Sequence, residues 1–237
     1  MRAVWKREMQ GYFYTPLGYV YLLVFILTAT LVFFAGNLYP RSSDLAGYYA
    51  MLSYLWMLLT PLLVMRLIAG ERRQMTDQLL ITSPTPIWVW VTGKFLSAVT
   101  VLVIAASLTL IHIAIIAIWG RVYPGEFVTV MLGFLLQGMA FTALDFFVAS
   151  LCRSPTTAFM LSLGANLLMW LADLLADAVS VPAIRTLLAR ISLYERFQPF
   201  LTGQLSVANV LYFLAFSLLC LVLSIRVVEA RRWSERA

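Results

Sequence analysis

Long apolar stretches alternate with short polar segments along the chain, and each stretch has the length of a helix that crosses a bilayer. Such a helix needs roughly 20 apolar residues, because the hydrocarbon core is about 30 Å thick and each helical residue rises about 1.5 Å. The pattern predicts an all-α integral membrane protein with six transmembrane helices in a single domain, residues 1–237. The predicted spans are about 18–36, 48–69, 93–118, 127–151, 157–179 and 207–228.

Two segments outside these spans have the pattern of helices with one apolar face. Near the N-terminus, Trp5, Met9 and Tyr12 recur at helical spacing, which predicts a helix lying in the headgroup layer within residues 1–17. Residues 180–206 also contain apolar positions at i, i+3, i+4 and i+7. These positions are Ile184, Leu187, Leu188 and Ile191. We expect this second segment to lie on the outer leaflet or to re-enter it.

The polar segment 70–86, between the second and third spans, is the chain's clearest candidate for a docking surface. It opens with charged residues, Leu79 and Leu80 provide apolar anchors, and Pro84 and Pro86 stop any helix sharply. A short, rigid helix beneath the membrane would transmit force from a soluble partner. The alternative interpretation is a solvated loop.

Composition supports a membrane protein and limits its chemistry. The chain is 62% hydrophobic and 12% charged, whereas about a quarter of the residues in a soluble domain are charged. The length leaves no room for a separate catalytic domain beside six spans. Cys152 and Cys220 are far apart and form no CxxC pair, so neither a disulfide nor a metal site is predicted.

The distribution of basic residues orients the spans. The net charge of +6 comes from residues that flank apolar segments, which is a topology signal and not a nucleic-acid-binding surface. With the N-terminus inside, twelve of the seventeen Lys and Arg residues fall on inward segments. The five outward ones are Arg41, Arg121, Arg185, Arg190 and Arg196. The positive-inside rule therefore predicts that both termini are cytoplasmic.

Motifs for catalysis are absent from the sequence. There is no GxxxxGK[ST] phosphate loop, since Gly93-Lys94 is followed by Phe95 and Trp88 stands where the first glycine would be. No HExxH, GxSxG or clustered carboxylates occur either. The chain is therefore not expected to hydrolyse ATP by itself or to act as an enzyme.

Ionisable residues within the spans suggest a second class of function. Helical rise places His112 and Asp173 at nearly the same depth, so they are a candidate intramembrane polar pair, with Asp177 one turn further out. Asp145 lies deeper, toward the cytoplasm. A stand-alone ion-coupled transporter would use such groups, but a structural role facing neighbouring helices is the simpler interpretation for each of them.

Several stretches resemble the ABC-2 type transporter permeases. The segment from Glu71-Arg72-Arg73 to Ser83-Pro84, followed by Gly93-Lys94-Phe95, is similar to the coupling-helix region of these exporters. Three further stretches resemble the gliding-motility-associated branch of that family. They are Lys6-Arg7-Glu8 with Tyr12-Phe13 and Thr15-Pro16-Leu17-Gly18-Tyr19, then Met65-Arg66-Leu67, then Leu211-Tyr212-Phe213 with Arg226-Val227-Val228-Glu229-Ala230-Arg231-Arg232-Trp233.

The resemblance implies a non-catalytic permease subunit of an exporter in the bacterial inner membrane. Such a subunit pairs with a cytoplasmic ATP-binding cassette ATPase, which binds the ATP and Mg, and with a second permease copy. An elbow helix would lie at 2–14 and the coupling helix at about 71–81, and 180–206 resembles the re-entrant region. The expected ATPase-docking residues are Glu71, Arg72, Arg73, Asp77, Leu79 and Leu80.

Two departures from the family pattern and several alternatives stay open. The chain has Met75-Thr76-Asp77 where family members commonly have Gly-Thr and an acidic residue, and Asp145 stands at a position that is usually small or apolar. A membrane protein with a large extracytoplasmic domain is a further expected partner. ATP-driven force on that partner without export is an alternative function, and the sequence does not identify a substrate.

Overall fold

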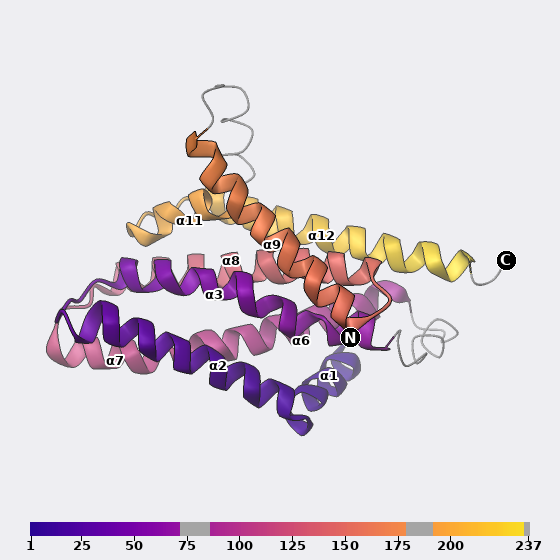
Figure 1. Ribbon diagram of the computed structural model, residues 1–237, viewed down its shortest axis with the longest axis horizontal. Coiled ribbons are helices and arrows are strands. Elements are labelled where there is room, and N and C mark those ends of the chain that lie inside the picture. The colour runs from indigo at the N-terminus through magenta and orange to yellow at the C-terminus, as the bar shows by residue number, and fades with distance from the viewer. Residues whose placement is uncertain (72–85, 179–191, 235–237) are drawn as a thin grey trace.

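The computed structural model describes residues 1–71, 86–178 and 192–234, and these residues form helices joined by short turns (Figure 1). No strand occurs among them. The described ranges leave out residues 72–85, which are most of the predicted docking segment, and residues 180–191 of the predicted outer segment 180–206.

The N-terminal half contains a short helix followed by two long ones. Helix α1 (Arg2–Tyr14) precedes α2 (Pro16–Phe33), which continues into the π-helical turn η1 (Phe34–Leu38). Helix α3 (Leu45–Val64) ends in a second π-helical turn, η2 (Arg66–Gly70). The Asp44 carboxylate begins α3 by accepting a hydrogen bond from the Gly47 N–H at 2.9 Å.

The C-terminal half continues the up-and-down pattern. Its helices are α6 (Ile87–Leu108), α7 (Leu110–Trp119), α8 (Pro124–Leu151), α9 (Pro155–Ala178), α11 (Leu193–Leu201) and α12 (Val207–Ser234). Proline opens α8 and α9, where the missing N–H costs nothing. Helix α7 follows α6 after Thr109, so together they form the predicted third span.

Five of the described helical stretches are long and apolar enough to cross a bilayer. They are Pro16–Leu38, Leu45–Gly70, Ile87–Ile118, Pro124–Leu151 and Val207–Arg231. The helix at the predicted fifth span, α9, has a shorter apolar stretch, Pro155–Leu171. The protein is thus a multi-pass helical membrane protein, and the count of six spans stays a prediction.

Helix α8 lies at the centre of the bundle, packed against α3, α6, α9, α11 and α12. The Trp56 ring of α3 lies between Phe25 and Phe134, with ring centroids 5.0 and 4.7 Å away. Its indole N–H donates to the Phe134 carbonyl oxygen at 3.1 Å. Close contact at this point is possible because α8 has Gly138 against Trp56, where a Cβ would lie 3.0 Å from the indole ring.

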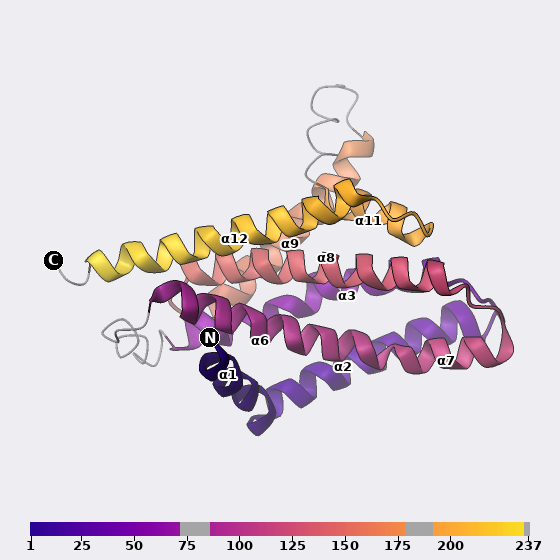
Figure 2. The same ribbon diagram turned by 180° about the vertical axis from the view of Figure 1, so that it is seen from behind.

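Different elements lie at the two ends of the bundle. Helix α1, the end of η2, the start of α6 and the C-terminal end of α12 lie at one end, while η1, α7 and α11 lie toward the other (Figures 1 and 2). Helix α1 occupies the range in which the sequence predicts an N-terminal helix, and its location in the headgroup layer stays a prediction.

The described part of the predicted outer segment is the amphipathic helix α11. Ser192 caps it by accepting a hydrogen bond from the Glu195 N–H at 2.8 Å. Its apolar residues Leu193, Phe197 and Phe200 are buried, and the helix packs on α8. The four apolar positions that predicted a helix, from Ile184 to Ile191, lie outside the described residues.

Candidate functional site

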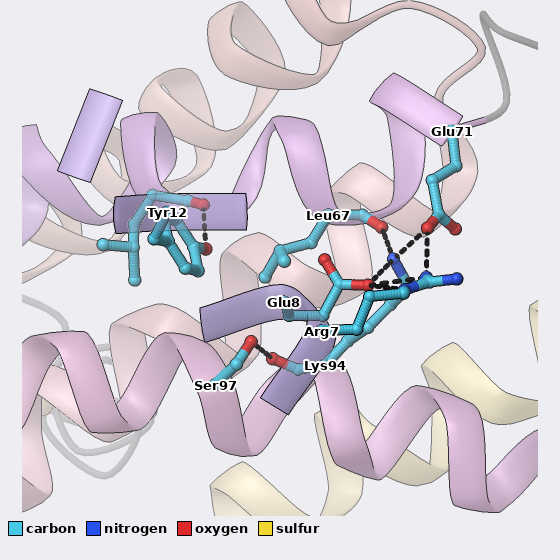
Figure 3. A network of polar contacts seen from close by, with 8 residues as sticks. Arg7, Glu8, Tyr12, Leu67, Glu71, Lys94 and Ser97 are labelled. Atoms are coloured by element: carbon cyan, nitrogen blue, oxygen red, sulfur yellow. Dashed lines mark hydrogen bonds and ion pairs between the residues drawn. The ribbon is translucent and has the colours of Figure 1, made fainter. Parts of the chain in front are cut away.

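Four charged side chains from three separate elements form one cluster beside the segment 72–85. Arg7 and Glu8 come from α1, Glu71 directly follows η2, and Lys94 lies in the second turn of α6 (Figure 3). The Arg7 guanidinium lies 2.7 Å from a carboxylate oxygen of Glu8 and 2.7 Å from one of Glu71. The cluster thus joins α1 to Glu71, which precedes residues 72–85, and to α6, which follows them.

Lys94 is the buried centre of this cluster. Its side chain is 0% exposed, and its ammonium nitrogen lies 3.2 Å from Glu8 and 2.8 Å from Glu71. It also donates a short hydrogen bond to the Leu67 carbonyl of η2 and lies 4.9 Å from the centre of the Trp90 ring. A buried ammonium is stable only with such partners, so Lys94 fixes both carboxylates and η2 around α6.

The neighbouring carboxylates stabilise the charged form of Arg7, the most exposed side chain of the cluster. Partial burial acts to lower the pKa of Arg7, but the hydrogen bonds and charges of Glu8 and Glu71 outweigh burial and raise that pKa above its ordinary value. The cluster contains two basic and two acidic side chains, so their formal charges cancel.

A close approach of α1 to α6 makes the cluster possible. A Cβ at Gly93 would lie 3.0 Å from the Val4 side chain and 3.4 Å from the Met1 carbonyl oxygen. The Trp5 indole N–H of α1 also donates to the Thr100 hydroxyl of α6 at 3.0 Å. Glycine at position 93 therefore lets the helices meet closely, and the next residue, Lys94, makes the ionic contacts.

The corner between α1 and α2 is tied to the end of α3 as well. The Tyr12 hydroxyl donates to the Leu63 carbonyl at 2.7 Å, and Arg66 donates to the Thr15 hydroxyl at 3.1 Å. Burial raises the pKa of Tyr12 well above its ordinary value, so the phenol stays a neutral donor. The Leu63 bond therefore ties α1 to the last turn of α3.

The structure brings together motif residues that local sequence patterns do not connect. Arg7, Glu8, Met65-Arg66-Leu67, Glu71 and Gly93-Lys94 belong to separate stretches of the chain, and they meet at one end of the bundle. The pairing of Lys94 with Glu8 and Glu71 is not predicted by the sequence pattern. The only sequence signal for it is a lysine placed inside an otherwise apolar helix.

Of the predicted docking residues, the described part of the chain contains Glu71. The others, Arg72, Arg73, Asp77, Leu79 and Leu80, lie outside the described residues, so their role stays a prediction. Glu71 is half-buried and paired with Arg7 and Lys94. It therefore anchors the start of the segment, whereas the prediction treats it as a contact with a partner.

The predicted His112–Asp173 pair is not tested, because the side chain of Asp173 lies outside the described residues. His112 of α7 is buried and has a hydroxyl partner at each ring nitrogen, Thr30 at 3.1 Å and Tyr48 at 2.8 Å. It also stacks on Phe33, with 4.8 Å between ring centres. These contacts join α7 to α2 and α3, which is a packing role.

The helices and the charged cluster together define a class of protein. The protein is a multi-pass helical membrane protein, and its charged cluster lies at one end of the bundle, where Glu71 precedes residues 72–85 and α6 follows them. In the described part of the chain, no group of three or more His, Cys, Asp or Glu side chains is arranged to hold a metal ion. The cluster is thus suited to holding elements together.

A comparison with protein families then identifies the chain. The sequence profile of the ABC-2 family transporter proteins matches residues 54–231. The chain belongs to this family and is a permease component of an ABC transporter. Such permeases are generally non-catalytic membrane subunits that work with a cytoplasmic ATP-binding cassette subunit. No curated protein matches the chain significantly.

Proposed function

We propose that this permease couples ATP hydrolysis by a separate cytoplasmic ATPase to export of a substrate. The ATPase binds the ATP and Mg and docks on residues 70–86, chiefly through Arg72, Arg73 and Asp77. The observation that carries the proposal is the Arg7–Glu8–Glu71–Lys94 cluster. It anchors the chain immediately before the docking segment to the helix immediately after it.

The cluster supports coupling because it gives the docking segment a rigid base. A load applied to residues 72–85 reaches Glu71 on one side and α6 on the other, and Lys94 ties these two points together. Through Glu8 the same load reaches α1, and through Leu67 it reaches η2 and α3. A stroke of the ATPase would therefore move α1, α3 and α6 as one unit.

The complete exporter would contain two copies of this chain and two ATPase subunits in the bacterial inner membrane, with both termini cytoplasmic. The family resemblance supports two permease copies. The low burial of the apolar windows in α2 and α12, 28% and 22%, leaves helix faces for a second copy or for lipid. A membrane protein with a large extracytoplasmic domain is a further proposed partner.

Co-expression with the ATPase tests docking and coupling separately. We expect Arg72→Glu combined with Arg73→Glu to abolish co-purification of the ATPase while the permease still inserts. We expect Lys94→Met to keep the ATPase bound but to lower permease-dependent stimulation of ATP hydrolysis by roughly tenfold or more. Without the Lys94 ammonium, α6 loses its ion pairs to Glu8 and Glu71, so a load on the docking segment no longer passes directly from Glu71 to α6.

The matched control is Lys6→Met, which removes an exposed lysine from α1 next to the cluster. It should retain both co-purification and stimulation. Stoichiometric ATPase bound to the Arg72/Arg73 double variant would overturn the docking assignment. Equal stimulation in the Lys94→Met and Lys6→Met proteins would overturn the coupling role of the cluster.

A further inference from the structure

Three helices bring polar side chains to one buried carboxyl group, that of Asp145 in α8. Thr60 comes from α3, Ser162 and Asn166 come from α9, and all four residues are at most 1% exposed. The Ser162 hydroxyl donates to the Asp145 backbone carbonyl at 3.4 Å, and Thr60 and Asn166 lie within interaction range of the carboxyl group. An ionisable residue inside the bundle of a membrane protein is a candidate functional site, because such a residue is costly to keep there. The proposed coupling mechanism does not use Asp145.

No cation compensates the Asp145 carboxyl group. None of the ion pairs among the described residues includes it, and neither of its oxygens has a hydrogen-bond partner there. Both oxygens are enclosed by protein atoms, so there is no room beside them for a water molecule or a metal ion. A lone carboxylate is strongly unfavourable in such a place, and a buried acid normally responds by taking up a proton. A proton needs no space, so it is the cation that this site can hold.

The charged residues of the neighbouring elements are engaged elsewhere. Helix α3 contains none, Lys94 of α6 belongs to the charged cluster, and Arg231 of α12 donates to the Ser150 carbonyl. Tyr21 of α2 is a titratable residue that acts electrostatically on Asp145, but a phenol is neutral and compensates no charge. The other charged residues of these elements with described side chains form no ion pair with Asp145, and they are Arg66, Glu195, Arg196, Arg226 and Glu229. The side chains of Asp173 and Asp177 in α9 lie outside the described residues.

The neighbours of Asp145 have the acceptor and the donor that a protonated carboxyl group requires. The Thr60 hydroxyl gives its hydrogen to the Trp56 carbonyl at 2.6 Å, so toward Asp145 it offers an acceptor. The Asn166 amide uses one N–H on the Met57 carbonyl at 3.0 Å and keeps its second N–H for a further acceptor. A carboxylic acid has one O–H donor and one carbonyl acceptor. An ionised carboxylate only accepts, so it would meet the Thr60 oxygen with no hydrogen between them.

We propose that Asp145 binds one proton inside the bundle and that its protonated carboxyl group links three helices. The acid O–H donates to Thr60 of α3, and the acid carbonyl accepts from Asn166 of α9. The proton is held as long as the three helices stay in contact. A movement that admits water between them lets the carboxyl group ionise, so this contact is a point at which a proton is taken up or released as the permease changes shape.

Infrared difference spectroscopy of the full chain in detergent tests the proposal. A protonated carboxylic acid has a carbonyl stretch that an ionised carboxylate lacks. The chain contains 11 Asp and Glu residues, and subtracting the spectrum of Asp145→Asn from that of the wild type isolates the one at position 145. We expect this difference to contain a carboxylic-acid band at neutral pH, which the variant has lost.

The matched control is Asp44→Asn, which changes an exposed carboxylate at the start of α3. Its difference spectrum should contain no such band, because a carboxylate in contact with water is ionised at neutral pH. Thr60→Val keeps the shape of the side chain and removes the acceptor. It should shift the Asp145 band to higher frequency, because the carboxyl group loses a hydrogen bond. If Thr60 had only a packing role, the band would not move.

The pH dependence of stability gives a second measurement. The thermal midpoint of Asp145→Asn should exceed that of the wild type by an increasing margin as the pH rises from acid to neutral. The reason is that the unfolded wild-type chain releases a proton that the folded chain keeps. Asp44→Asn should not show this increase.

Three outcomes would overturn the proposal. Absence of a carboxylic-acid band from the wild-type minus Asp145→Asn spectrum would show that Asp145 is ionised. A band that Thr60→Val leaves unmoved would remove the link to α3. A difference in midpoint that stays constant or shrinks with rising pH would show that the folded chain does not hold the proton.

Discussion

Asp145 is a fully buried carboxyl group in the last two turns of the central helix α8, and its side-chain oxygens have no hydrogen-bond partner among the described residues. Thr60 and Asn166 lie near enough to interact with it, but the Thr60 hydroxyl donates to Trp56 O and the Asn166 amide donates to Met57 O. A buried polar group in this state costs stability, which points to retention for another reason.

We expect Asp145→Asn to raise the free energy of unfolding by about 1–3 kcal/mol, because the amide has nearly the same shape and cannot ionise in a site that offers no partner for a charge. The measurement is the thermal midpoint of the detergent-purified chain, with a rise of about 2–4 °C for each kcal/mol. Glu126→Gln is the matched control, since Glu126 stands in the first turn of the same helix, where its charge is favourable. A lower midpoint for Asp145→Asn would show that the carboxyl group stabilises the fold.

At the level of elements, glycines on α8 decide how closely its neighbours pack. A Cβ at Gly133 would lie 2.5 Å from the Phe200 Cβ and 3.1 Å from the Phe197 ring, both on α11. These two phenylalanines are fully buried. Gly133 is therefore the position at which α8 admits α11, and a methyl group there would push the two helices apart.

Gly133→Ala should lower stability by about 1–3 kcal/mol through overpacking, even though alanine is the better helix former. Gly164→Ala is its matched control, since Gly164 lies in α9 and a Cβ there would meet nothing within 4 Å. That variant should be neutral or more stable by up to about 1 kcal/mol. Thermal unfolding of the two proteins in the same detergent compares them directly, and equal midpoints would contradict the close contact between α8 and α11.

The charged cluster and the cavity lined by Asn37 and Arg41 lie at opposite ends of the molecule. The charged cluster lies with α1, the start of α6 and the C-terminal end of α12, while the Asn37–Arg41 cavity lies at the other end. If the positive-inside orientation is correct, the first end faces the cytoplasm and the second faces outward.

Labelling with a membrane-impermeant maleimide tests this orientation. Tyr39→Cys should react in intact cells, because Tyr39 is exposed at the end of the bundle that the positive-inside rule places outside. Glu229→Cys, near the end of α12, should react only after the cells are permeabilised. The native Cys152 and Cys220 are buried and provide a low background. Reaction of Glu229→Cys in intact cells would reverse the orientation.

Much of the helical architecture is readable from the chain. The apolar run at 18–36 lies within the helix formed by α2 and η1, and the run at 127–151 lies within α8. The helix predicted near the N-terminus is α1. These features are local, because hydrophobic length and helical spacing concern residues within a few turns of one another.

The candidate site could be predicted only in part from the sequence. Glu71 is predicted as a docking residue, but its pairing with Lys94 depends on α1 packing over Gly93, and that packing is a tertiary event. The contacts of His112 illustrate the same limit: its ring nitrogens contact Thr30 and Tyr48, which depth along the helix does not predict, and the side chain of its predicted partner Asp173 lies outside the described residues. Depth along a helix does not specify which neighbour that helix faces.

The sequence by itself determined that this protein is helical, lies in a membrane, has a charged segment after its second span and has no nucleotide-binding loop. Only the tertiary structure decided that Arg7, Glu8, Glu71 and Lys94 form one cluster, and that Asn37 and Arg41 share one cavity. The reason is physical. Burial in lipid is set by runs of neighbouring residues, but ionic and hydrogen-bond partners are set by which helix faces meet, and residues such as Glu8 and Lys94 are far apart in the chain.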